Sequence, residues 1–408
     1  MYAVLVWIDR RISKEYESNL QNLGIKSLRD NNQEGKGNVV QWLCQNSSKP
    51  IVHRFSGGPQ AGHRVVLNGK SHVCSSWGSG VLLGVPTYLN ENVFVDPICI
   101  VNEYKALVDE GIEVPPLYID YYCKVITPYD VLSDSLNIEV KNNGTCGKGI
   151  HATFERYKDL DSKGVLAKRM MYINNVEKLL IEAEHYYKFQ RDSELYKLFG
   201  DACKFIESHP ETFKMVPWSP ANDRQEGDNY DTVIWEGSQG LLLDMERGFM
   251  PHCTPSKTGL NGIPEYVLKE SPEVYLVMRP YLTRHGNGYT PYRIYDISKY
   301  FTLEEPTNLD TGIQGVFKKG VFDFSLLNRV IDRHCLDNYQ RTYNCKFNWV
   351  ITHWDCSISS YIPIIDTIGE AVLREKEEFL NDLNILDITC LDTFLGIGEN
   401  SNIIRYEE

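Results

Sequence analysis

Two glycine-rich segments near the start of the chain carry side chains suited to phosphate chemistry. In the first, QEGKG, Gly35 and Gly37 would let the backbone approach a phosphate closely, and Lys36 would add positive charge. It does not match the Walker A pattern, so an ordinary turn is the alternative. The second, SGGPQAGH, ends in His63, which is placed to act as a general acid or hydrogen-bond donor. A lone histidine is more often a packed or surface residue, but the glycines before it favour a close approach by a ligand.

Three later segments join polar side chains to the ends of predicted strands. WEGSQG would place Gln239 at the carboxyl edge of a sheet, where α/β proteins bind ligands, although a Gln exposed on a tight turn fits equally well. VITHWD ends in Asp355, whose carboxylate matches the two adjacent donors of guanine, with a helix-capping Asp as the alternative. FLGIG, through Gly396 and Gly398, predicts a turn that closes over a base edge.

The elements that position these segments are predicted from short apolar runs. Residues 2–8 indicate a first buried strand, and further strands are expected at 51–55, 93–95, 232–235, 274–278 and 349–352. Helical patterns lie between them, the clearest with apolar side chains at Val176, Leu179, Leu180, Ala183 and Tyr187. This alternation predicts an α/β fold with a single large, mostly parallel sheet flanked by helices. We expect residues 1–408 to form one domain, with an extra helical excursion at about residues 10–29.

Composition excludes several classes of protein. The 408 residues carry a net charge of −13, which argues against a nucleic-acid partner because phosphate backbones are held by an excess of Lys and Arg. Eleven cysteines without paired CxxC spacing, and no cleavable apolar leader, predict a cytoplasmic protein with reduced thiols. The apolar run at 2–8 is too short to span a membrane. His252 and Cys253 lack further ligands at zinc spacing, so no zinc site is expected.

The order of the motifs resembles that of adenylosuccinate synthetases. QEGKG is followed by GGPQAGH with VVLNG, NGTCGKG, EGSQGLLLD with PHCTPSKT, ITHWD and a terminal GIG, from about residue 31 to the C-terminus. The patterns GGxxAGH and EGxQGxLLD are the most specific. The resemblance implies a homodimeric ligase with one large sheet and a P-loop-like site for GTP. Such enzymes move the γ-phosphate of GTP to O6 of IMP, and the amino group of L-aspartate then displaces it.

The resemblance also implies roles for individual residues. The phosphates of the donor would be held by Gly35, Lys36 and Gly37, its base by Asp355, Gly396 and Gly398, and Mg²⁺ by the carbonyl of Gly62. His63, Gln33 and Gln239 occupy the catalytic positions, with His63 donating to the transferring phosphoryl group. The substrates would contact Gln60, Thr145, Gln239, Thr254, Arg284, Lys318 and Lys319.

This chain departs from the family pattern at several of these positions. Gln33 stands where the family has the Asp that removes the purine N1 proton, and an amide cannot act as a general base. The aspartate-binding loop has lost its arginines and offers Lys318 and Lys319, which lack the bidentate fork of arginine. His353 replaces the guanine-reading Lys, so either GTP or ATP is a possible donor. Arg156 and Arg169 are candidates for the arginine that reaches across the dimer.

These departures leave three hypotheses. The leading one is a ligase that phosphorylates O6 of IMP, GMP or dGMP and couples it to L-aspartate. A phage-type branch of the family that converts dGMP also lacks the catalytic Asp, and GVFDFS and the chain's ending resemble that branch. The second keeps the phosphoryl step with another amine or purine. The third is a non-catalytic nucleotide sensor, which Gln33 favours but which the retained Lys36, His63, Gln239 and Asp355 disfavour.

Overall fold

A ten-stranded sheet runs through the computed structural model, which describes residues 4–10, 35–60, 62–137, 147–222, 230–285, 295–302, 317–397 and 402–406. In spatial order its strands are β19 (Asn402–Arg405), β18 (Cys390–Ile397), β15 (Lys346–Ile351), β11 (Glu273–Met278), β1 (Val4–Arg10), β10 (Thr232–Glu236), β2 (Pro50–Arg54), β5 (Thr87–Leu89), β7 (Leu117–Asp120) and β9 (Phe213–Val216). Within these ranges only β1 and β19 run antiparallel to their neighbours, and the other eight strands point the same way. The predicted α/β fold with a mostly parallel sheet is confirmed.

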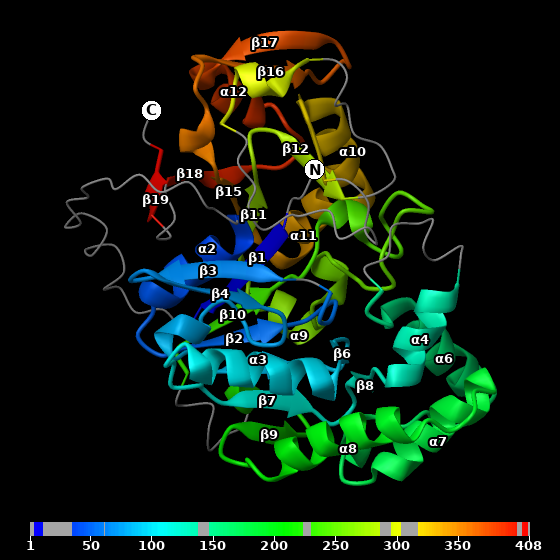
Figure 1. Cartoon of the computed structure of the whole chain (residues 1–408). Helices are drawn as coiled ribbons and strands as arrows, with labels where there is room; N and C mark the ends of the chain where they lie inside the picture. Colours follow the sequence, from blue (N-terminus) through cyan, green and yellow to red (C-terminus); the bar gives the residue numbers. More distant parts are fainter. Residues whose placement is uncertain are drawn as a thin grey trace.

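Both faces of the sheet centre are buried, as the alternation of side chains along β11 demonstrates. Tyr275 and Val277 pack against helix α2 (Gly35–Gln45) on one face. Val274, Leu276 and Met278 join the larger apolar cluster on the other face. A strand buried on both sides reads as a continuous apolar run, which is why this strand was visible in the sequence. In Figure 1, α2 lies beside the centre of the sheet, where it can present its first turn to the strand ends.

Helices gather around the end of the sheet formed by β5, β7 and β9 (Figure 1). They are α3 (Pro97–Asp109), α4 (Pro128–Leu136), α6 (Ile150–Ser162), α7 (Val176–Tyr187) and α8 (Ser193–Glu207). The α7 bounds match the apolar spacing in the sequence, and the side chain of Asn175 caps its first turn by accepting from the Lys178 N–H at 3.1 Å.

Smaller elements complete the described fold. The short strands pair as β3 (His63–Leu67) with β4 (Lys70–Cys74), β6 (Phe94–Val95) with β8 (Lys124–Val125), β12 (Leu282–His285) with β13 (Phe317–Gly320), and β14 (Phe322–Asp323) with β16 (Tyr361–Ile365) and β17 (Ala371–Glu375). The remaining helices are α9 (Glu265–Leu268), α10 (Phe324–His334), α11 (Leu336–Tyr343) and α12 (Lys376–Leu383).

Most predicted strands are found within three residues of their expected bounds, as β1, β2, β10, β11 and β15. The run at 93–95 forms only the short β6, outside the large sheet. Apart from its first residue, the predicted excursion at 10–29 lies outside the described residues. Among the described residues, no helix is both long and apolar enough to cross a membrane.

Candidate functional site

The segment predicted to bind phosphate begins helix α2, close to the residue that follows the carboxyl end of β15. A side chain on Gly35 would bring its Cβ to 2.5 Å from Oγ1 of Thr352, just after β15, so only glycine fits there. Lys36 donates from Nζ to the carbonyl oxygen of Ser238, just after β10, at 3.2 Å. The N–H groups at a helix N-terminus and a nearby ammonium favour anions. Gly35 and Lys36 lie together at the start of α2, and Gly37 packs against the carbonyl of Arg64.

His63 is buried at the start of β3, and both its ring nitrogens meet oxygen atoms. Nδ1 contacts the carboxylate of Glu236, and Nε2 lies 3.3 Å from the Ser238 carbonyl oxygen. Ser79 donates to Glu236 from its N–H at 3.0 Å and its Oγ at 2.5 Å. Burial lowers the pKa of His63, and Glu236 opposes that shift. Burial alone would raise the pKa of Glu236, but the contact with His63 and the charge of Arg54 lower it to about 2, so the carboxylate is ionised.

The turn that carries Ser238 is fixed by hydrogen bonds from two directions. Its Oγ donates to the Ser56 carbonyl at 2.5 Å, and its N–H donates to Ser56 Oγ at 3.2 Å. The buried guanidinium of Arg54 donates to Ser238 Oγ at 3.0 Å. Gly57 has φ +74° and leaves no room for a side chain, because a Cβ would lie 2.8 Å from Ser238 Cβ. The motifs SGGPQAGH and WEGSQG, which contain His63 and Gln239, are therefore held together as one unit.

Two glutamine amides in this unit have atoms that are buried without a hydrogen-bond partner among the described residues. Gln239 donates from Nε2 to Thr254 Oγ1 at 3.3 Å, but its Oε1 has no partner. Both amide atoms of Gln60 also lack one. Buried polar atoms are nearly always paired, so these amides have hydrogen-bonding capacity that their protein neighbours do not use. The structure brings Gln239 and Thr254, both predicted to contact the substrate, into contact.

The two-stranded ribbon β12–β13 brings positive charges together. Arg284 lies directly opposite Lys318 in the register, and Lys319 lies opposite the residue before Arg284. Arg284 donates from Nη2 to the carbonyl of His252 at 3.2 Å. Burial, Arg284 and Lys318 all lower the pKa of His252, which lies two residues before Thr254. The ribbon is therefore attached to the loop that carries Thr254, and its cations suit a carboxylate ligand.

The predicted base-binding segments meet the phosphate segment at Thr352. Gly396 packs against this threonine, since a Cβ on Gly396 would lie 3.2 Å from Thr352 Cα. Asp355 is exposed in a short 3-10 turn, and His353 is buried with φ +61° and its Nδ1 3.2 Å from Thr352 Oγ1. One expectation is corrected here: Gly396 lies inside β18, which pairs with β19, and does not form a turn. The strand continues because its edge is covered by the last described strand of the chain.

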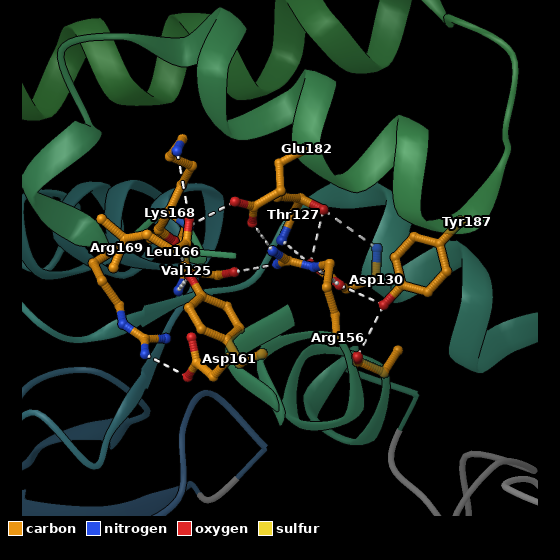
Figure 2. A network of polar contacts seen from close by, with 12 residues as sticks. Val125, Thr127, Asp130, Arg156, Asp161, Leu166, Lys168, Arg169, Glu182 and Tyr187 are labelled. Carbon is orange, nitrogen blue, oxygen red and sulfur yellow. Dashed lines mark hydrogen bonds and ion pairs between the residues drawn. The ribbon is translucent and has the colours of Figure 1, made fainter. Parts of the chain in front are cut away.

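Arg156 was a candidate for reaching across a dimer, and the structure contradicts this role. It is 1% exposed, and its guanidinium donates to both carboxylate oxygens of Asp130 at 2.9 and 2.8 Å and to Glu182 at 2.6 Å (Figure 2). A buried, fully paired arginine holds its own helices together. Arg169 is partly exposed and pairs with Asp161 at 2.9 Å, so it is still a candidate.

The structure adds residues that sequence reasoning did not select. Glu236 was visible inside EGSQG, but only its burial and its contact with His63 reveal a purpose. Arg54, Ser79 and Glu103 were not considered. Glu103 accepts hydrogen bonds from three consecutive backbone N–H groups at residues 75–77 and so fixes the loop that leads to Ser79. A charged residue at the end of an apolar strand was the available signal for Arg54 and Glu236.

Some predicted site residues lie outside the described ranges, namely Gln33, Thr145 and Gly398. Gly62 is described, is exposed, and immediately precedes His63. Its backbone oxygen is a ligand type that Mg²⁺ accepts, and nucleotide-bound Mg²⁺ takes few protein ligands. No three His, Cys, Asp or Glu side chains gather around a possible metal position in the described parts of the chain. The donors present thus fit a Mg²⁺ ion that arrives with a nucleotide.

Comparisons with known proteins agree on one family. A family model described as adenylosuccinate synthetase matches residues 32–338. The adenylosuccinate synthetase of Francisella tularensis subsp. novicida is 30% identical over 313 residues, and that of Francisella philomiragia is 28% identical over 311 residues. Each alignment covers 72% of this chain and 71% of the relative.

Two solved structures share the fold. One is the fully ligated adenylosuccinate synthetase from Plasmodium falciparum, with a TM-score of 0.68 and 19% identity over 91% of this chain and 97% of that one. The other is the cyanophage S-2L succinoaminodeoxyadenylate synthetase (PurZ), bound to dGMP and to dATP as an energy donor. It has a TM-score of 0.56 and 15% identity over 91% of this chain and 93% of that one.

Proposed function

Because this chain belongs to the adenylosuccinate synthetase family, whose members are nucleoside-triphosphate-dependent ligases that form a C–N bond, we propose that it couples a 6-oxopurine nucleotide to L-aspartate. The acceptor would be IMP, GMP or dGMP, and the phosphate donor GTP or ATP. The single observation that carries this proposal is the convergence of three motifs on one carbonyl oxygen. Lys36 from the first motif and His63 from the second both contact the Ser238 carbonyl of the third.

The proposed reaction has two steps. O6 of the purine attacks the γ-phosphorus of the donor while the N1 proton is lost to water, the bond to the β-γ bridging oxygen breaks, and the nucleoside diphosphate leaves. The neutral amino group then attacks C6 and gives up one proton, and phosphate departs with O6. Such transfers depend on positioning and on donors for the charge that develops on oxygen. Lys36 and the first turn of α2 would hold the donor phosphates, while His63 would donate to the transferring group.

The substrates would lie on either side of this centre. Gln239, Gln60 and Thr254 would hold the acceptor nucleotide, which explains the buried amide atoms without partners. Arg284 and Lys318, together with Lys319 and Thr145, would bind the remaining anionic groups of the nucleotide and of the amine. Beside Thr352, Asp355 with Gly396 and Gly398 would contact the base of the donor.

The identity of the purine depends on Gln33. A neutral side chain would tolerate a 2-amino group that crowds the surroundings of a carboxylate at this position, and the phage structure with a similar fold was bound to dGMP. We therefore expect dGMP to be accepted. A direct titration in which IMP binds and dGMP does not would refute this choice.

The proposal includes a Mg²⁺ ion, a homodimer and a cytoplasmic location. When bound, Mg²⁺ would neutralise charge on the donor phosphates, and the carbonyl of Gly62 would be one of its ligands. Arg169, rather than the buried Arg156, would be available to reach a partner subunit.

A product assay tests the proposal. The protein is incubated with Mg²⁺, GTP or ATP and each of IMP, GMP, dGMP and dIMP, with and without L-aspartate, and products are identified by mass spectrometry. A succinylated nucleotide that is absent without aspartate is the expected result. Lys36→Met should abolish it, whereas Lys158→Met, at a lysine that is 65% exposed, should not. Tight nucleotide binding without any product would instead support the sensor hypothesis.

A further inference from the structure

A carboxylate that no solvent reaches lies directly behind His63. Glu236 ends β10 and is 0% exposed, so it cannot itself contact a substrate. All its described partners are donors: the N–H and Oγ of Ser79, and Nδ1 of His63. An ionised carboxylate only accepts hydrogen bonds, so Nδ1 must carry a proton.

The opposite nitrogen of the same ring faces the phosphate-binding lysine. His63 Nε2 lies 3.3 Å from the Ser238 carbonyl oxygen, and Lys36 Nζ donates to that oxygen at 3.2 Å. The two nitrogens are therefore neighbours. The carbonyl they share is itself held in place, because Ser56 and Arg54 bind the rest of Ser238.

We propose that Glu236 is a positioning residue, whose carboxylate fixes the ring of His63 with Nδ1 turned inward so that Nε2 is presented beside Lys36 to the transferring phosphoryl group. This inference rests on the proposed function for the identity of that group. A carboxylate that orients an imidazole in this way sets its rotamer and stabilises the imidazolium form, in which Nδ1–H stays on Glu236 while Nε2–H can donate to the phosphoryl group. Without the carboxylate, the buried ring can rotate about its Cβ–Cγ bond, and either nitrogen can then face Lys36.

The orientation can be measured without any substrate. In protein labelled with ¹⁵N at histidine, the His63 signals are assigned by their loss in His63→Gln, and the proton-bearing nitrogen is read from one-bond and multiple-bond ¹H–¹⁵N couplings. The expected result is a proton held on Nδ1 in slow exchange with water. A ring with no proton on Nδ1 in the unsubstituted protein would overturn the inference, whatever the variants do.

Two variants separate positioning from simple stability. Glu236→Gln keeps the size of the side chain but can turn its amide NH₂ toward Nδ1, so the fixed Nδ1 proton should be lost. Glu103→Gln removes another buried carboxylate that binds the same loop but does not touch His63, and it should keep that proton. Thermal unfolding of both variants establishes that they fold.

Steady-state kinetics, measured with the acceptor nucleotide that the product assay identifies, complete the test. Glu236→Gln should lower kcat by roughly 10- to 100-fold, as removal of orienting partners does elsewhere, while the Kd of the donor nucleotide changes less than about threefold. An unchanged kcat would refute the positioning role. If no form of the protein turns over any nucleotide, the proposed function fails. The positioning of His63 by Glu236 is then refuted only if Nδ1 of His63 also lacks its proton.

Discussion

The contact between Gly35 and Thr352 links the phosphate-binding helix to the strand end that leads to Asp355. A methyl group on Gly35 would sit 2.5 Å from Thr352 Oγ1 and 3.3 Å from both its Cβ and its Cγ2. Of the two other threonine rotamers, one returns Cγ2 to the same place, and the other, which puts only a hydrogen there, moves Oγ1 away from its present partner. That partner is the Met278 carbonyl oxygen, at 3.1 Å. Gly35→Ala must therefore displace the first turn of α2 or break this hydrogen bond.

The cost follows from the size of this displacement. Forcing an extra methyl group into a packed site costs about 1–3 kcal/mol. If the first turn of α2 moves to accommodate it, the N–H groups that are proposed to hold the donor phosphates move as well. We then expect the Kd of the donor nucleotide to rise roughly 5- to 150-fold, since about 1.4 kcal/mol corresponds to a factor of ten.

Isothermal titration with the donor nucleotide and Mg²⁺ measures this change, and titration of the acceptor provides an internal reference. Gly200→Ala is the matched control, because its Cβ would meet only Val176 at 3.8 Å, within α8. It should leave binding unchanged and stabilise the protein by about 0.5–1 kcal/mol. Adding Thr352→Ala should recover part of the affinity lost by Gly35→Ala. Donor binding by Gly35→Ala that equals that of the unsubstituted protein would refute the reasoning.

Three further predictions concern stability and the amine site. Burial lowers the pKa of His53 from 6.5 to about 3, so the folded state needs its neutral ring. The stability that depends on this neutral ring is fully present above pH 6.5 and is lost as the pH falls toward 3. Between pH 7 and pH 5 the free energy of unfolding should therefore fall by about 2 kcal/mol because of His53. Urea unfolding of His53→Gln should not show this fall. Asp130→Ala, which removes the buried partner of Arg156, should lower the free energy of unfolding by about 3–5 kcal/mol. Asp161→Ala, which breaks the more exposed pair with Arg169, should lower it by less than about 1 kcal/mol. Equal losses would contradict the assignment of Arg156 to a buried network. Lys318→Ala should raise the KM of the amine substrate about tenfold with little change in kcat, and the opposite split in steady-state kinetics would remove Lys318 from the amine site.

Part of the site could be predicted from the sequence because most strands of the large sheet run parallel. Parallel strands end at a common edge, which is why the motif of Gln239 was placed at the carboxyl edge of a sheet and why motifs that follow separate strands, such as those of His63, Ser238 and Thr352, lie near one another. The helix at 176–187 was predictable because its apolar face repeats at helical spacing over three turns.

Other features depend on contacts that an apolar run does not encode. The first strand was predicted, but nothing in its residues indicates that it runs antiparallel between β10 and β11. Gly396 was expected in a turn because glycine favours turns, yet pairing with β19 keeps it in a strand. Arg156 looked available for chemistry and Glu236 was not selected; only the structure identifies Arg156 as a structural cation and Glu236 as a partner of His63.

The central claim is that O6 of a purine nucleotide is phosphorylated and then leaves as phosphate. An acceptor nucleotide labelled with ¹⁸O at O6, incubated with donor, Mg²⁺ and L-aspartate, tests this directly by mass spectrometry of the inorganic phosphate. One ¹⁸O atom in each phosphate, matched by one succinylated nucleotide without label, is the predicted result. Unlabelled phosphate, with ¹⁸O retained on the purine, would contradict the account.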